Sequence, residues 1–182
     1  INPLVELAQA LYQSDGLDDI EIHLCTYHAR QLLALRSDLE NQLDQILNRN
    51  KELAVFDLKA VSSVLKKAQA SNVIFIVLAT PVAEVGRNHD YDWAIVEPSS
   101  MRSIIQLAGR VKRHRPEPVT TPNMLIMSTN IRALKQGSNL GVKDKIPVFC
   151  QPGFETKTNK LLGQELMLSS HKTADILGGA LN

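Results

Sequence analysis

The residues with the clearest chemical potential are two arginines, Arg110 and Arg113, in the octapeptide QLAGRVKR at residues 106–113. If this segment is helical, Gln106, Arg110 and Arg113 lie on one face of the helix. Gly109 would share that face and let a partner approach the backbone closely. Guanidinium groups are suited to binding phosphate oxygens. An ordinary amphipathic helix with a solvated basic face fits the same spacing.

The elements that must position these arginines alternate between strands and helices. Short apolar runs predict strands, and apolar residues that recur every three or four positions predict helices. The predicted strands are residues 20–25, 53–56, 73–79, 93–96 and 124–127, and the predicted helices are residues 3–13, 32–47, 57–68 and 101–113. Asp57 is expected to cap the third helix, and residues 97–100 the fourth. The continuous apolar run at 73–79 predicts a strand buried on both faces.

This alternation predicts an α/β fold with a mainly parallel sheet flanked by helices. Polar residues follow three of the predicted strands, at Thr26-Tyr27-His28, Thr80-Pro81 and Ser99-Ser100. Ligands of parallel sheets bind beyond the carboxyl ends of the strands. We therefore expect these residues and the arginine helix to form one site.

Composition limits the class of protein. The 182 residues, 44% hydrophobic and with a net charge of +1, describe a folded chain with room for one domain and an appended segment. Two cysteines, Cys25 and Cys150, make no disulfide framework and fit a reducing, cytoplasmic setting. No apolar run is long enough to span a membrane, and no signal peptide is visible. The first residue, Ile1, suggests a piece of a longer protein.

The amino-acid composition of the chain changes after Arg115. Three prolines predict a stiff linker over 116–122, which divides residues 1–115 from residues 123–182. In the latter region the sequence predicts a polar loop at 136–145, a turn-rich apolar patch at 148–154 and a broken helix over 161–177.

Other chemical sites are less well supported. No phosphate-binding loop of the Walker type is present, and no Asp-Glu pair follows an apolar strand. His89-Asp90, with Asp92 nearby, has the residue types of a metal site, but the other histidines are dispersed, which favours a solvated turn. Cys25 lies in a predicted strand and is expected to be a core residue. Cys150 has no identifiable base partner.

Three segments resemble motifs of superfamily 2 helicases. Thr80-Pro-Val-Ala-Glu84-Val-Gly86 resembles motif V, Gln106-x-x-Gly109-Arg110-x-x-Arg113 resembles motif VI, and residues 27–30 resemble the motif IV region. More narrowly, residues 84–93, 97–115 and 148–155 resemble the CRISPR-associated helicase–nuclease of type I-F interference systems. Asn88 stands where the superfamily pattern has an aspartate, and its amide keeps the hydrogen-bonding shape without the negative charge.

The resemblance implies that residues 1–115 form the second RecA-like lobe of such an enzyme and that residues 123–182 continue the lobe and begin the C-terminal region. In that family the full protein unwinds and translocates on target DNA with ATP and degrades it with an HD nuclease domain. The implied partners are single-stranded DNA, a crRNA-guided surveillance complex and other CRISPR proteins, with no membrane. ATP and Mg²⁺ would serve the full-length enzyme. The ligands of Mg²⁺ and of the nuclease metal would lie outside these residues, which would hold no metal and be inactive alone.

The resemblance also implies roles for individual residues. Arg110 and Arg113 would be catalytic arginine fingers, and Gln106 would orient the nucleotide or an opposing side chain. Thr80, Glu84, Gly86 and Gly109 would couple the nucleotide state to DNA. Thr26, Tyr27, His28 and Thr80 would contact the single-strand backbone. Lys112, His114 and Arg115 would add to that contact or form a solvated helix end.

Two alternatives remain. The chain would be a non-catalytic α/β module that binds nucleic acid or protein, with Arg110 and Arg113 as a plain phosphate patch. It would otherwise belong to a different superfamily 2 motor, a translocase or restriction subunit.

Overall fold

The computed structural model describes residues 2–13, 19–50, 52–84, 88–129, 131, 158–159, 164–165 and 173–174. The chain divides into two compact units. The first consists of residues 1–91 and 112–117, and the second of residues 92–111 and 118–182. The predicted division at the proline-rich segment 116–122 stays a prediction.

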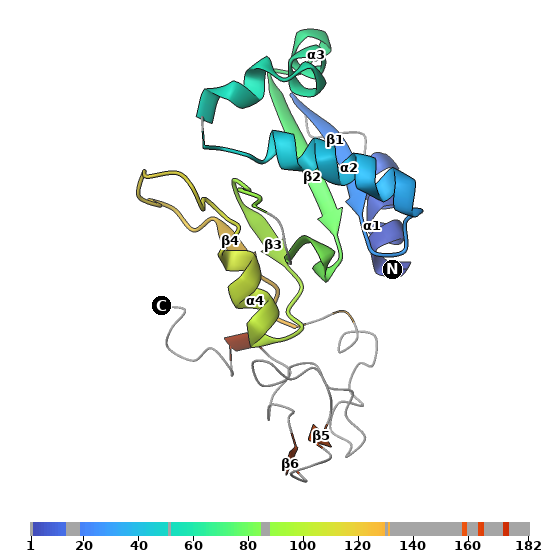
Figure 1. The fold of residues 1–182 in the computed structure, drawn as a ribbon, viewed down its shortest axis with the longest axis vertical. Helices are drawn as coiled ribbons and strands as arrows, with labels where there is room; N and C mark the ends of the chain where they lie inside the picture. The colour runs from blue at the N-terminus through green and yellow to red at the C-terminus, as the bar shows by residue number, and fades with distance from the viewer. Residues whose placement is uncertain are drawn as a thin grey trace. The chain divides into compact units, whose positions relative to one another are not determined.

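The first unit is built on a parallel strand pair. β1 (Ile20–Tyr27) pairs with β2 (Asn72–Ala79) along its whole length, from Ile20 opposite Asn72 to Tyr27 opposite Ala79. Parallel neighbours need a long crossover connection. Here it consists of α2 (Leu33–Ile46), the 3₁₀ helix η1 (Glu52–Asp57) and α3 (Lys59–Lys67). The N-terminal α1 (Asn2–Gln13) and α2 lie on opposite faces of the pair (Figure 1).

The core of this unit lies between α2 and the strand pair. Its buried residues are Tyr27, Leu43, Leu47 and Ala83, packed with Cys25, Leu39, Val77, Val82 and Tyr91. Leu39 and Leu43 of α2 and Leu47 at its C-cap are spaced four residues apart, so they lie on one face of the helix. The helix was predicted over residues 32–47 from its recurring apolar residues, but Leu32 and Leu35 are 73% and 65% exposed. Only the apolar residues of its C-terminal part are therefore packed in the core.

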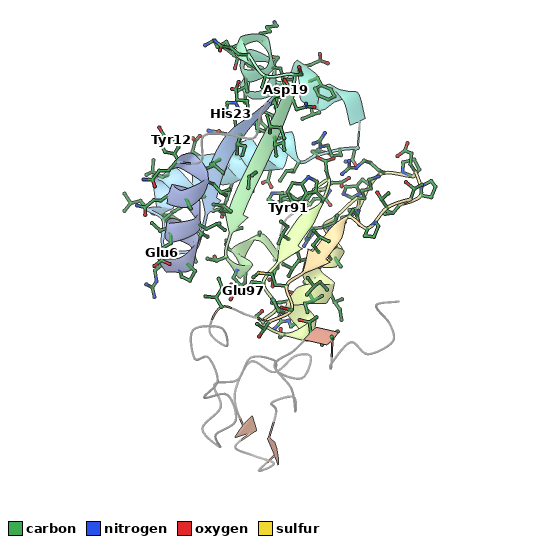
Figure 2. The ribbon with its side chains drawn as sticks, turned by 180° about the vertical axis from the view of Figure 1, so that it is seen from behind. Glu6, Tyr12, Asp19, His23, Tyr91 and Glu97 are labelled. Carbon is green, nitrogen blue, oxygen red and sulfur yellow. The ribbon has the colours of Figure 1, made fainter. Side chains whose placement is uncertain are left out.

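Asp19 holds the amino ends of the two strands together. Its carboxylate accepts a hydrogen bond of 2.8 Å from the Ser71 backbone N–H (Figure 2 labels Asp19). This bond, together with one to the Ser71 side chain, lowers the pKa of Asp19 below its ordinary value. The two strands are thus joined at the end opposite to the polar residues of interest.

Three local predictions in this unit are wrong. Residues 53–56 lie in η1 and not in a strand, and Val55 is buried there. Asp57 belongs to the same 3₁₀ helix and does not cap α3, whose N-cap is Leu58 without a side-chain hydrogen bond. The reason is the continuous turn, in which the Leu58 N–H donates to the Val55 carbonyl. β2 is not buried on both faces, since Phe75 is 44% exposed.

The second unit repeats the strand–helix–strand arrangement on a smaller scale. β3 (Ala94–Val96) and β4 (Met124–Ile126) form a parallel pair, and α4 (Met101–Ala108) follows β3. Buried Val96 and Ile104 form its core, with Ala94, Met101, Leu107, Met124 and Ile126 packed against them. The Ser100 hydroxyl accepts a hydrogen bond of 3.2 Å from the Ser103 N–H, which confirms the predicted N-cap of this helix.

Several predictions for the C-terminal part fall outside the described residues. These are the loop at 136–145, the apolar patch at 148–154 and the role of Cys150. The helix predicted over 161–177 lies largely outside them as well, and it is wrong at β6 (Gln164–Glu165), which pairs antiparallel with β5 (Thr158–Asn159). Thr173 is buried, and its hydroxyl donates to the Met127 carbonyl at 2.7 Å.

Parallel strand pairs joined and flanked by helices confirm the α/β prediction. Within the residues that the structure describes, no helix combines the length and apolar character needed to cross a membrane.

Replacing Ser100 by Ala should destabilise the second unit, because the Ser103 amide loses its acceptor at the start of α4. A loss of about 0.5–2 kcal/mol in the free energy of unfolding is expected from such caps. Urea denaturation of the purified chain measures it. Ser99→Ala is the matched control, since Ser99 is exposed and does not cap the helix. Equal effects of the two substitutions would contradict this role of Ser100.

Candidate functional site

Four of the predicted site residues lie at one edge of the first unit. Thr26 and Tyr27 are the last residues of β1, His28 follows them, and Thr80 follows β2. The Thr80 N–H donates to the Tyr27 carbonyl at 3.1 Å. The parallel pairing therefore brings the two strand ends together, as the sequence predicts for the carboxyl edge of such a sheet.

The side chains at this edge differ in what they can offer a ligand. The Tyr27 ring is only 1% exposed, and its hydroxyl donates to the Glu40 carboxylate at 2.8 Å, so it is a core residue. Thr26 and His28 are half-buried. The His28 Nδ1 atom is buried and has no hydrogen-bond partner among the described residues.

Gln31 shapes this edge, and the sequence analysis did not single it out. Its amide nitrogen donates to the Thr26 carbonyl at 2.8 Å, and its amide oxygen accepts from the His28 N–H at 3.1 Å. A polar side chain that bonds nearby backbone groups is common just before a helix. Gln31 thus fixes the turn that carries His28 away from β1.

The motif V segment begins with a single 3₁₀ turn. The Ala83 N–H donates to the Thr80 carbonyl at 3.1 Å, which starts η2 (Pro81–Glu84). Glu84 is half-buried at the end of this turn. Gly86 lies outside the described residues.

The motif VI segment is not one helix, so the prediction that α4 extends to Arg113 is wrong. α4 ends at Ala108, with Gly109 as its C-cap. The Arg110 N–H then donates to the Leu107 carbonyl at 2.8 Å in a tighter turn. Lys112 follows with a φ of 47°, a left-handed conformation that costs a non-glycine residue about 1–2 kcal/mol.

A long-range bond explains this break. The Lys112 N–H donates to the Tyr91 carbonyl at 2.9 Å and not to an α4 carbonyl. Gly109 itself has an ordinary φ of −69°, and a Cβ placed on it would come no closer than 3.5 Å to the Gln106 carbonyl. The backbone therefore does not require glycine at this position.

The predicted catalytic residues are consequently divided between the two units. Gln106 and Arg110 are half-buried and lie on and just after α4, in the second unit. Arg113 belongs to the first unit and is exposed. Its guanidinium forms no hydrogen bond or ion pair with the other described residues.

Asp90 binds the backbone that carries Arg113. Its carboxylate accepts hydrogen bonds from the Arg113 N–H at 3.0 Å and the His114 N–H at 3.1 Å. The Arg115 guanidinium adds an ion pair at 2.9 Å and also donates to the Tyr91 carbonyl at 2.9 Å. Its side chain is only 8% exposed. Arg115 is therefore an internal partner and not part of a solvated helix end.

His89 and Asp90 are both fully buried, so the predicted solvated turn is wrong. The His89 Nε2 atom lies 2.9 Å from the Asp44 carboxylate, and its Nδ1 atom lies 3.1 Å from the Tyr91 hydroxyl. The position of Tyr91 can be followed in Figure 2. Among the described residues, no group of three potential metal ligands is present.

Asn88, which replaces the usual aspartate, also contacts the motif VI segment. Its amide oxygen lies 2.9 Å from the His114 Nε2 atom. The carboxylate that binds this segment belongs to Asp90, two residues later. No local pattern marks Asp90 for this role, because its partners lie 23 to 25 residues away.

The pKa of Asp90 reflects opposing effects. Burial is the largest single effect and raises it, but the Arg115 guanidinium and the His114 and Arg113 amides together lower it below its ordinary value. At neutral pH the carboxylate is therefore ionised and accepts all three hydrogen bonds.

Parallel strands joined by helices, with polar residues where the strands end, fit a RecA-like α/β lobe. Residues 1–116 match the family described as CRISPR-associated nuclease/helicase Cas3, C-terminal. The chain belongs to this family, which confirms the resemblance drawn from its helicase motifs.

Two curated relatives support the narrower type I-F resemblance. Both are named CRISPR-associated nuclease/helicase Cas3 subtype I-F/YPEST. The protein from Pseudomonas aeruginosa is 46% identical over 183 residues, which cover 100% of this chain and 16% of the relative. The protein from Pectobacterium atrosepticum is 44% identical over 164 residues, which cover 88% of this chain and 14% of the relative. The chain thus spans a small part of the length of these relatives.

The stability that the Asp90 carboxylate contributes should depend on pH. Because its pKa is lowered on folding, this stability is complete above the ordinary value of 3.8 and is lost as the pH falls through the lowered value. Urea denaturation of the chain and of Asp90→Asn, between pH 7 and pH 3, measures the effect. The difference between the two should be largest at neutral pH and shrink in the acid range. A difference that stays constant down to pH 3 would contradict this assignment.

Proposed function

We propose that this chain is the second helicase lobe of an ATP-dependent helicase–nuclease that unwinds and translocates on target DNA during CRISPR interference. The observation that carries the proposal is an exposed arginine, Arg113, at the motif VI position of a chain that belongs to the Cas3 C-terminal family. The relatives are named as nuclease/helicases, and the activity of the whole protein is carried over from that name.

In this proposal ATP lies against the lobe, and its hydrolysis supplies the free energy for movement on DNA. The phosphate-binding loop and the Mg²⁺ ligands belong to another part of the full-length protein. Arg113 stabilises charge on the transferring phosphoryl group, a contribution of about 10³–10⁵ in rate in GTPase systems. Arg110 contributes a second positive charge, and Gln106, four residues before Arg110, orients the nucleotide.

The strand-end residues form the DNA side of the proposed mechanism. Thr26, His28 and Thr80 contact the phosphodiester backbone of single-stranded DNA. Tyr27 does not contact DNA through its ring, which is buried. Its backbone carbonyl accepts a hydrogen bond from the Thr80 N–H and so helps to position Thr80. Glu84, Gly86 and Gly109 couple the nucleotide state to this contact. The crRNA-guided surveillance complex recruits the whole protein in the cytoplasm.

Replacing Arg113 by Ala in the full-length protein should abolish ATP-driven unwinding and lower DNA-stimulated ATP hydrolysis by about 10³-fold or more, since the transition-state charge loses its partner. The fold should be intact, because the side chain is exposed. ATPase and strand-displacement assays measure the loss, and thermal melting checks the fold.

Arg102→Ala is the matched control for this experiment, since Arg102 is another exposed arginine, at the start of α4. It should retain near-parental activity. Near-normal unwinding by Arg113→Ala would overturn the proposal and favour a module in which the arginines form a plain phosphate patch.

Replacing His28 by Ala should weaken the binding of single-stranded DNA by the full-length protein by about two- to tenfold, as expected for one hydrogen bond. Because the proposed contact is to the backbone, the loss should be equal for oligo-dT and for mixed sequences. Fluorescence anisotropy at a fixed salt concentration measures it.

His23→Ala is the matched control, because His23 lies within β1, the strand that His28 follows, and is stacked on Phe75 away from the carboxyl edge. It should bind DNA like the parent, and so a loss common to both variants would argue against a contact at the strand end.

A further inference from the structure

We propose that Asp90 is a positioning residue of the nucleotide site, because its buried carboxylate fixes the backbone from which the Arg113 guanidinium projects. This inference rests on the proposed function of Arg113. Asp90 itself does not touch the nucleotide in this account.

The first argument is the geometry at the carboxylate. One oxygen accepts from the Arg113 N–H at 3.0 Å and the other from the His114 N–H at 3.1 Å. Successive backbone amides can converge on one anion where a turn makes the backbone concave. Lys112, with its φ of 47°, provides that curl immediately before Arg113.

The second argument is that the described hydrogen bond of the Arg113 backbone amide goes to Asp90. α4 ends five residues earlier, at Ala108, so the helix does not set the course of the backbone at this position. The Lys112 N–H and the Arg115 guanidinium both donate to the Tyr91 carbonyl, which holds the chain on either side. The backbone N–H groups of Arg113 and His114 donate to Asp90.

The third argument is the contrast between backbone and side chain at Arg113. Its amide is bound by a fully buried carboxylate, whereas its side chain is exposed. An arginine that stabilises charge on a ligand needs a backbone held in place and a guanidinium group that the ligand can reach. A displacement of about 1 Å in a reacting group can cost about 10²-fold in rate.

The segment from Asn88 to Tyr91 therefore binds the segment from Lys112 to Arg115 along its length. Asn88 contacts the His114 ring, Asp90 binds three successive residues, and Tyr91 accepts two hydrogen bonds. Asp90 follows the motif V segment closely in the sequence, and its hydrogen bonds connect it to the backbone of Arg113.

The test is Asp90→Asn in the full-length protein. The substitution keeps the shape, but one oxygen becomes an NH₂ group, which cannot accept a hydrogen bond from a backbone amide. The expected result is a fall of about tenfold or more in the kcat of DNA-stimulated ATP hydrolysis, with KM for ATP within about threefold of the parent. Hydrogen exchange at the amides of residues 113 and 114 should become faster.

Asp44→Asn is the matched control, because Asp44 is the carboxylate that binds His89 in the same cluster. It should leave kcat and the exchange of these two amides near the parental values. A folded Asp90→Asn protein with parental kcat, beside an inactive Arg113→Ala protein, would overturn this inference and leave the proposed function standing. An active Arg113→Ala protein would overturn the proposed function itself.

A second variant decides the case if Asp90→Asn does not fold. Arg115→Met removes the ion pair but leaves both backbone amides on Asp90. If Asp90 positions Arg113 through the amides of residues 113 and 114, this variant should keep more than about a tenth of the parental kcat, even if its melting temperature falls. A loss of kcat as large as that of Arg113→Ala would contradict the inference.

Discussion

The buried carboxylate of Asp90 is the interaction on which the path of the chain beyond α4 depends. A fully buried anion is unfavourable unless hydrogen bonds and a counter-charge replace its hydration. Two successive amides and the Arg115 guanidinium supply both. The same bonds attach residues 112–117 to the first unit, although they follow α4 of the second unit in sequence. Together with the two bonds to the Tyr91 carbonyl, these bonds join the Arg113 segment to the segment at 88–91.

This arrangement divides motif VI in a way that matters for the proposed mechanism. Gln106 lies on α4, whose Ser100 cap and apolar face are local features of the second unit, and Arg110 follows the Gly109 C-cap of this helix. Arg113 is positioned by the segment at 88–91 and shares its unit with the strand-end residues Thr26 and Thr80. The arginine proposed to act on the phosphoryl group and the residues proposed to contact DNA are therefore parts of one compact unit.

Local sequence patterns predicted the elements that depend on local physics. The apolar runs at β1 and β2, the four-residue recurrence of α2 and the serine cap of α4 each follow from neighbouring residues, and each is present. The short segment at 53–56 was mispredicted, because a brief apolar run fits a strand and a 3₁₀ turn equally well. The candidate site was predicted at the strand edge, where parallel pairing brings Tyr27 and Thr80 together.

The remaining features depend on residues far apart in the chain. The backbone course at Lys112 and Arg113 is set by hydrogen bonds to Tyr91 and Asp90, which lie more than twenty residues upstream. The burial of His89-Asp90 follows from partners on α2 and in the motif VI segment. A dipeptide of two polar residues carries no sign of such partners, and so a solvated turn was the natural expectation.

The most direct test of the account is a structure of the full-length protein bound to single-stranded DNA and a non-hydrolysable ATP analogue. The account predicts a distance of about 2.7–2.9 Å between an Arg113 guanidinium nitrogen and a γ-phosphate oxygen, as in other charge-assisted hydrogen bonds. It also predicts that the Asp90 carboxylate still accepts from the Arg113 and His114 amides. An Arg113 side chain directed away from the nucleotide while another residue occupies the γ-phosphate would contradict the central claim.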